Sequence, residues 1–207
     1  MTRLIIVSGS GRCGSSMLMQ MLDKAGIKCA GSYPDFEDPR GMQELDLDWL
    51  AGYEGAVKIL DPHRYLPAIR LVDAKAIRLD RDRKQQARSW CKVSRDVVGR
   101  KPNREDALRV AKLLKQARKP GVQKLVDVTG SVPLFLTYES VVQHPRVNGE
   151  KIARFLGVDL DLAAMASQVI SRPTTCLDGL LERDMVRMGR EAVEEMIRQQ
   201  RMLRAAG

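Results

Sequence analysis

Glycines, serines and one arginine crowd a short stretch near the start of the sequence, and this combination can hold an anion. Gly9, Gly11 and Gly14 fall within residues 8–16, with Arg12 between them. Four apolar residues, mostly β-branched, precede the stretch, and an apolar run typical of a helix follows it. A strand, a glycine-rich turn and a helix direct backbone N–H groups and the positive end of a helix dipole at an anion. We therefore predict a site for a phosphate-like group.

The spacing departs from the loop G-x-x-x-x-G-K-[ST] that binds nucleoside triphosphates. Gly9, Gly14 and Ser16 match its glycines and its hydroxyl, but Ser15 stands where a lysine neutralises the β- and γ-phosphates. ATP or GTP hydrolysis is therefore poorly supported, and the cation has moved to Arg12. The loop instead suits one 5′-phosphate that carries a further charged group. A glycine-rich turn without a ligand is the alternative.

Strand-like and helix-like segments alternate along the chain, which predicts an α/β fold. Such alternation gives a three-layer arrangement, a parallel sheet with helices on both faces. Pro120 and Gly121 are expected to break the chain after a helix. The predicted strands are Leu4–Val7, Ala56–Leu60, Lys75–Leu79 and Val132–Tyr138, and the predicted helices are Ser15–Lys24, Met42–Leu50, Tyr65–Val72, Arg81–Val98, Arg104–Arg118, a helix within Glu139–Leu156, and Leu181–Leu203.

Candidate polar groups follow three of these strands. The first strand ends in the glycine loop, the second carries Lys58 and ends near His63, and the third is followed by Arg81 and, eight positions later, Ser89. In parallel sheets, ligands bind beyond the carboxyl ends of the strands. We therefore expect these groups to converge on one site.

Three motifs, in order, resemble those of the sulfotransferases that use 3′-phosphoadenosine 5′-phosphosulfate (PAPS). The loop is similar to the family's R-S-G-T-T or K-S-G-T-T segment, and the stretch from Arg81 to Ser89 is similar to R-D-P-x-x-x-x-x-S. The third resembles R-Y-E-D-L…P followed by I-x-x-F-L-G. In the order of these three motifs, the segments in this sequence are Gly11-Arg12-Cys13-Gly14-Ser15-Ser16, then Arg81-Asp-Arg-Lys-Gln-Gln-Ala-Arg-Ser89, and then Leu136-Thr-Tyr-Glu-Ser-Val-Val-Gln-His-Pro145 with Ile152-Ala-Arg-Phe-Leu-Gly157.

The resemblance implies a P-loop-related, nucleotide-kinase-like fold and transfer of a sulfuryl group from PAPS to a hydroxyl or amine. It also implies that residues 11–16 hold the 5′-phosphosulfate and that Arg12 stabilises the bridging oxygen as adenosine 3′,5′-bisphosphate (PAP) leaves. Ser15 and Ser16 would donate to the 5′-phosphate, and Arg81 and Ser89 would bind the 3′-phosphate. Family members need no metal, and we expect none here.

The second strand and the residues after it supply candidates for the groups that contact sulfate and accept the proton of the acceptor. A similar strand end in cytosolic members reads K-T-H, in which the lysine contacts sulfate and the histidine is the base. Here Lys58 and His63 are five positions apart rather than two. We take Lys58 and His63 as catalytic candidates, with Asp61 as the alternative base.

Two other functions remain open. A kinase with a divergent loop would need a lysine or a metal-binding partner, for which Asp80 or Asp127 could be offered. A relative without catalytic activity could bind a phosphorylated ligand or nucleic acid. The sequence does not identify the acceptor, which could be a carbohydrate, a lipid, a small metabolite or a protein tyrosine.

Composition limits the remaining possibilities. The 207 residues suit one domain, 1–207. We expect substrate or lid loops at 28–55 and C-terminal helices at 160–207 that include a homo-oligomer contact. The net charge is +9, but aromatic residues are only 4%, which argues against nucleic acid as a partner. No apolar run is long enough for a membrane span. Four scattered cysteines and no leader-like segment favour the cytoplasm.

Overall fold

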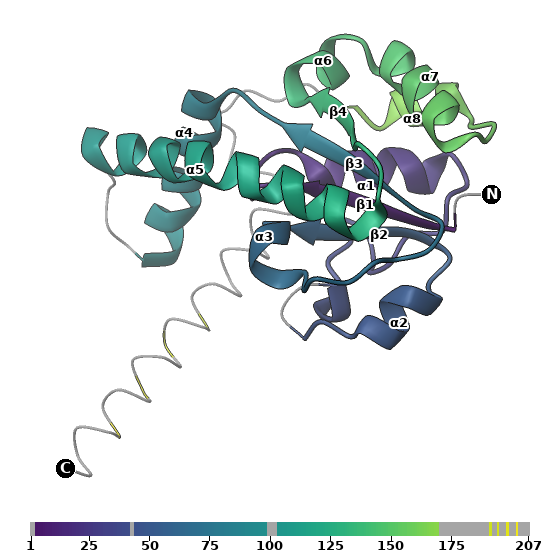
Figure 1. The fold of residues 1–207 in the computed structure, drawn as a ribbon. Coiled ribbons are helices and arrows are strands. Elements are labelled where there is room, and N and C mark those ends of the chain that lie inside the picture. The colour runs from purple at the N-terminus through teal and green to yellow at the C-terminus, as the bar shows by residue number, and fades with distance from the viewer. Residues whose placement is uncertain are drawn as a thin grey trace.

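The protein folds around a four-stranded parallel sheet in the order β2-β1-β3-β4 (Figure 1). The computed structural model describes residues 3–41, 44–98 and 103–169, without the side chains of 94–98, and single helical positions at 191, 194, 198 and 202. The predicted α/β fold with a parallel sheet is confirmed. The strands are β1 (Leu4–Gly9), β2 (Gly55–Leu60), β3 (Ala74–Asp80) and β4 (Leu134–Thr137).

The central strand β1 is buried along its whole length because both faces of the sheet are covered. Ile5 and Val7 pack on one face, and Leu4 and Ile6 pack on the other. This explains why the strand reads as a continuous apolar run rather than an alternating one. Each such side chain that leaves water contributes about 1.5–3 kcal/mol to folding.

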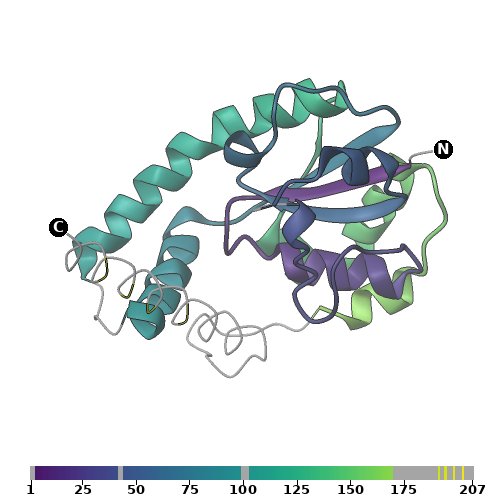
Figure 2. The same cartoon turned by 90° about the horizontal axis from the view of Figure 1, so that it is seen from below.

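Helices form a layer on each face of the sheet (Figures 1 and 2). On one face lie α1, α7 and α8, and on the other lie α2, α3 and the second half of α5. The first half of α5 pairs with α4 beyond the carboxyl ends of the strands. The helices are α1 (Ser15–Lys24), α2 (Leu47–Gly52), α3 (Pro62–Tyr65), α4 (Arg83–Val98), α5 (Arg104–Thr129), α6 (Tyr138–Gln143), α7 (Pro145–Leu156) and α8 (Leu162–Ser167), with a 3₁₀ turn at Pro39–Gly41.

The prediction of a helix at Tyr65–Val72 is wrong. The helix there is the single turn α3, which ends at Tyr65. Pro67 explains the error, because a proline disfavours helical backbone in the residue before it. Leu66 accordingly adopts extended backbone angles (φ −77°, ψ 126°).

The predicted break at Pro120–Gly121 is also wrong, because α5 continues through both residues to Thr129. A Cβ on Gly121 would lie 3.0 Å from Arg78 Nη1 and 3.7 Å from Pro62. The glycine therefore lets the helix approach the sheet closely, and this packing outweighs the poor helix propensity of the pair.

Smaller differences concern boundaries. The helix predicted at Met42–Leu50 is α2, which begins after Asp46, whose side chain accepts a hydrogen bond from the Trp49 N–H at 2.9 Å. The segment Glu139–Leu156 holds α6 and α7 rather than one helix. The predicted helix Leu181–Leu203 lies outside the described residues apart from four single positions, so the oligomer contact expected there stays a prediction.

Candidate active site

The glycine loop joins β1 to α1 in the predicted place, and its glycines are required by contacts with distant side chains. A Cβ on Gly11 would lie 2.7 Å from the Trp90 ring on α4. A Cβ on Gly14 would lie 2.5 Å from the Tyr138 ring, and Gly14 also has a φ of +99° that side chains rarely permit. The loop is therefore packed tightly against the elements that follow β3 and β4.

Helix α4 binds the carbonyl groups of this loop. The Gln86 side-chain amide donates to Ser10 O at 3.0 Å and to Gly11 O at 2.9 Å, and Trp90 Nε1 donates to Gly11 O at 2.9 Å. In a trans peptide the N–H points opposite to the carbonyl of the same unit. The N–H groups that follow these carbonyls, on Gly11 and Arg12, therefore point away from α4.

The predicted 3′-phosphate residues meet the loop at Arg12. Arg12 Nε donates to Ser89 Oγ at 3.1 Å, and Arg81 Nη1 donates to the Arg12 carbonyl at 3.3 Å. The Arg81 guanidinium also stacks over the Tyr138 ring, 4.3 Å from its centroid, while its Nε is buried without a hydrogen bond. Two segments almost 80 positions apart in sequence thus form one cationic cluster beside the start of α1.

Cys13 and Ser15 have a structural part in the loop. The Cys13 thiol is fully buried, and burial raises its pKa, whereas hydrogen bonds from Ser15 lower it in part. Of the two hydroxyls at the start of α1, Ser16 is the one that Lys58 of the second strand binds.

Lys58 reaches the loop from β2. Only 1% of this residue is exposed, yet its Nζ donates to Ser16 Oγ at 3.2 Å, to the Asp35 carbonyl, and to Glu37 Oε1 at 2.9 Å. Burial lowers the pKa of Lys58 from its ordinary 10.5, and Glu37 opposes that shift. The lysine therefore joins the hydroxyl at the start of α1 to a loop that follows α1.

The structure does not bring Lys58 and His63 together. Lys58 lies on the α1 face of the sheet, whereas His63 lies on α3 beside Gly121 of α5, with its Nδ1 buried and without a hydrogen bond. His63 and Asp61 line a cavity of about 500 Å³ with Gly11 and with apolar side chains of α4 and α5. The two candidate bases, His63 and Asp61, thus line the same cavity, which lies next to the loop.

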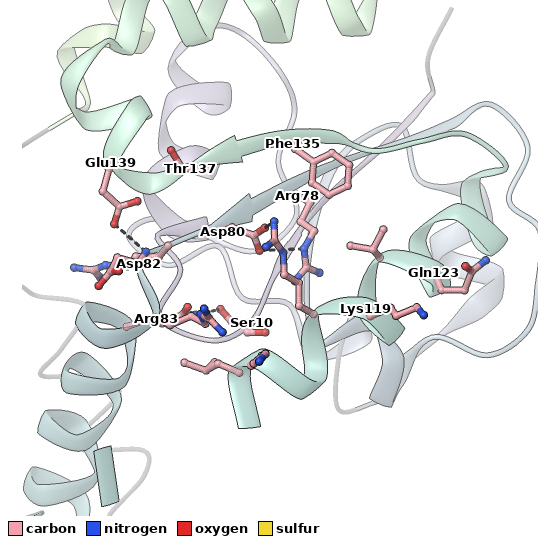
Figure 3. A pocket seen from close by; sticks show the side chains of 16 residues that line it. Ser10, Arg78, Asp80, Asp82, Arg83, Lys119, Gln123, Phe135, Thr137 and Glu139 are labelled. Atoms are coloured by element: carbon pink, nitrogen blue, oxygen red, sulfur yellow. Dashed lines mark hydrogen bonds and ion pairs between the residues drawn. The ribbon is translucent and has the colours of Figure 1, made fainter. Parts of the chain in front are cut away.

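A larger cavity of about 920 Å³ lies between α4, α5 and the ends of β3 and β4 (Figure 3). The buried Arg78 and the exposed Arg118 both pair with Asp80, at 3.1 and 3.0 Å. Glu139 accepts a hydrogen bond from the Asp82 N–H. Six cationic residues line this basic cavity: Arg78, Arg81, Arg83, Lys115, Arg118 and Lys119.

Sequence reasoning missed Gln86, Trp90 and Glu37. Gln86 and Trp90 lie one helical turn apart on α4, a spacing that marks one face of a helix but does not say what that face contacts. Glu37 lies in the segment 28–55, which was predicted to hold substrate or lid loops, but no residue of that segment was singled out. The described residues contain no group of three or more His, Cys, Asp or Glu side chains able to hold a metal ion. Their helices also include none of the length and apolar character needed to cross a bilayer.

Comparison with known proteins places the fold. No protein-family model and no curated protein matches the chain. Mouse sulfotransferase SULT7A1 complexed with PAP aligns with a TM-score of 0.56 and 20% identity, over 82% of this chain and 65% of that one, so this chain spans less than two thirds of its length. The sulfotransferase domain from the curacin biosynthetic pathway aligns with a TM-score of 0.52 and 13% identity, over 88% of this chain and 82% of that one. A sulfotransferase from Alicyclobacillus acidocaldarius aligns with a TM-score of 0.44 and 18% identity, over 91% of each chain.

The chain therefore has the fold of sulfotransferases, a P-loop-like α/β architecture. At these identities the likeness extends to the fold and not to the substrates.

Proposed function

We propose that the protein transfers a sulfuryl group from PAPS to an acceptor hydroxyl or amine. The observation that carries this proposal is the cluster of Arg12, Ser89 and Arg81 beside the start of α1. A triphosphate site needs a lysine within its loop, whereas this loop is flanked by a second cationic segment. An adenosine with phosphates at both its 5′ and 3′ positions matches two adjacent anion-binding segments.

Each part of the cluster has a role in holding the donor. The N–H groups of the loop and the Ser16 hydroxyl bind the 5′-phosphosulfate at the positive end of the α1 dipole. Arg81 and Ser89 bind the 3′-phosphate, which distinguishes PAPS from other adenine nucleotides. Arg12 contacts both segments, so its guanidinium lies between the two ends of the donor.

The reaction needs positioning and fixed charge more than covalent chemistry. The acceptor oxygen forms a bond to sulfur, the bond from sulfur to the bridging oxygen breaks, and PAP leaves with that electron pair. Arg12 stabilises the charge that develops on the bridging oxygen. Lys58 Nζ donates to Ser16 Oγ and so orients that hydroxyl toward the donor.

Radiolabelled sulfate supplied as PAPS tests this function. The purified protein should move label from PAPS to acceptors in cell extracts and release PAP, and Arg12→Ala should lower that rate by about 10²–10³-fold. A thermal-shift series with PAP, AMP and ATP–Mg²⁺ gives the matching binding result. Preference for ATP–Mg²⁺ would favour a kinase, and equal, salt-sensitive shifts would favour unspecific anion binding.

A further inference from the structure

The basic cavity beside the glycine loop has no part in the function derived above, apart from Arg81. Six cationic side chains line it together with three carboxylates, those of Asp80, Asp82 and Glu139, so the lining carries a surplus of three positive charges. A cavity lined by an excess of one sign of charge raises the local concentration of ligands of the opposite sign. An anion is therefore the ligand that this cavity suits.

The three carboxylates of the basic cavity are already occupied within the protein. Asp80 accepts a hydrogen bond from Arg78 Nε at 3.1 Å and pairs with Arg118 Nη2 at 3.0 Å (Figure 3). Asp82 and Glu139 accept hydrogen bonds from backbone N–H groups near the start of α4, at 2.9 and 3.1 Å. These bonds leave several of the cations without a carboxylate.

Three of the cations have no ionic partner in the part of the chain that the structure describes: Arg83, Lys115 and Lys119. Lys115 and Lys119 lie one turn apart on α5, so both are on the same face of the helix. Arg83 begins α4, on another side of the cavity. The unpaired charges thus come from separate elements and meet around one space.

Arg78 gives this cavity a buried wall, since only 2% of its side chain is exposed. Among the described residues, its single hydrogen bond is the one from Nε to Asp80. Its terminal nitrogens therefore have no protein acceptor, and Nη1 lies only 3.0 Å from where a Cβ on Gly121 would be. Leaving the N–H groups of a buried cation without an acceptor is costly. The two oxygens of a carboxylate, phosphate or sulfate group match such a guanidinium.

The size and the remaining lining of the cavity indicate an organic molecule rather than a single inorganic ion. A volume of about 920 Å³ falls within the range of pockets that hold small molecules. Phe135, which is 45% exposed, offers the face of a ring, while Thr137 and Gln123 offer hydrogen-bonding groups. The ligand should therefore combine an anionic group with an uncharged part.

The basic cavity adjoins the glycine loop without coinciding with the cluster assigned to the donor. Ser10 and Gln86 line it, and the Gln86 amide donates to Ser10 O and Gly11 O. Neither Arg12 nor Ser89 is among the described residues that line it. A molecule in this cavity would therefore lie beside the loop, next to the donor.

We propose that the basic cavity binds the acceptor, and that the acceptor is a small molecule with a carboxylate, phosphate or sulfate group of its own. This inference rests on the proposed function. Arg78 and Arg118 hold the anionic group beside Asp80, and Lys115 and Lys119 offset the repulsion between an anionic acceptor and an anionic donor. The uncharged part of the acceptor packs on Phe135.

A fractionated cell extract tests the charge and the size of the acceptor. The extract is first filtered to remove macromolecules. Its small molecules are then separated on an anion exchanger at neutral pH, and each fraction is supplied with radiolabelled PAPS and the wild-type protein. Label should pass to molecules that the exchanger retains, and about tenfold less should pass to those that flow through, which is the worth of one charged hydrogen bond.

A pair of double variants tests the cavity itself. Lys115→Ala combined with Lys119→Ala should raise the KM for the retained acceptors about tenfold, and leave kcat and the affinity for PAP unchanged. Both lysines are exposed, so folding should not suffer. Arg109→Ala combined with Lys112→Ala is the control, because it removes the same charge from exposed positions of α5 that do not line the cavity. Its KM should match that of the wild type.

The outcomes that overturn this inference are distinct from failure of the proposed function. Label found in the flow-through, in the macromolecules (nucleic acid included) or in no fraction, with a protein that binds PAP, would exclude a small anionic acceptor. Equal KM values for the two double variants would exclude the cavity as its site, and a parallel loss of PAP affinity at Lys115 and Lys119 would assign the cavity to the donor. A wild-type protein that neither binds PAP nor releases it from PAPS would instead refute the sulfotransferase function, and this inference with it.

Discussion

Lys58 on β2 and Arg78 on β3 are buried cations on the two strands that flank β1, and they face opposite layers of the protein. Arg78 faces α5 and pairs with Asp80, whereas Lys58 faces α1 and binds Glu37 and Ser16. Burying a charge is unfavourable unless it is paired and hydrogen-bonded. Arg78 forms part of the packing of α5, while Lys58 reaches the loop that we propose binds the donor.

Lys58 should make stability depend on pH in a defined direction. Burial lowers its pKa below 10.5, so the unfolded chain binds more protons than the folded one between the lowered pKa and 10.5. The folded state is therefore penalised at lower pH, and this penalty is relieved as the pH rises through that window. Relative to Lys58→Met, the wild type should gain unfolding free energy as the pH rises from neutral towards 10.5.

Chemical denaturation at several pH values measures that difference. Lys151→Met, on the exposed surface of α7, is the matched control and should show no such trend. A wild type that instead loses stability relative to Lys58→Met with rising pH would mean that Glu37 outweighs burial and raises the lysine pKa.

The sequence predicted that Arg12, Arg81 and Ser89 converge, and they do. Arg12 and Arg81 follow two adjacent strands, β1 and β3, and Ser89 lies on the helix after β3. Glu37 could not be predicted in the same way. It follows no strand, and its position depends on the backbone of Phe36 and on the reach of Lys58. Neither feature has a sequence pattern.

At the scale of elements, α4 determines the shape of the glycine loop. Its side chains bind two loop carbonyls, and Trp90 fills the space that a Cβ on Gly11 would need. Two errors in the predicted helices both concern the effect of a proline. The proline signal ended α3 early at Pro67 but did not end α5 at Pro120, because tertiary packing against Arg78 decides the second case.

Gly11→Ala tests the role of α4. The new Cβ would lie 2.7 Å from Trp90, so either the loop or the indole must move, and the strain should lower stability by about 1–3 kcal/mol. PAP affinity should fall as well, since the loop N–H groups lose their orientation. Gly52→Ala on α2 is the control, because its Cβ meets nothing within 4 Å. Equal effects of both variants on PAP binding would show that α4 does not shape the site.

At the scale of the whole molecule, the candidate site residues Arg12 and Arg81 lie just beyond the carboxyl ends of β1 and β3, as parallel topology predicts. The net charge of +9 agrees with an anionic ligand, and the basic cavity adds six cationic residues next to the loop. Composition alone could not have located that charge. The layers could be predicted from the alternation of elements, whereas the two cavities depend on the continuous helix α5, which the sequence did not predict.

Isothermal titration of PAP and AMP into the wild type and Arg81→Ala tests the central claim, that Arg81 and Ser89 add a 3′-phosphate site to the loop. Arg81→Ala should weaken PAP binding by about 1.5–3 kcal/mol, the worth of a charged hydrogen bond, and leave AMP binding nearly unchanged. Lys84→Ala, exposed on the first turn of α4, is the control for charge alone. Equal losses for PAP and AMP would contradict the account.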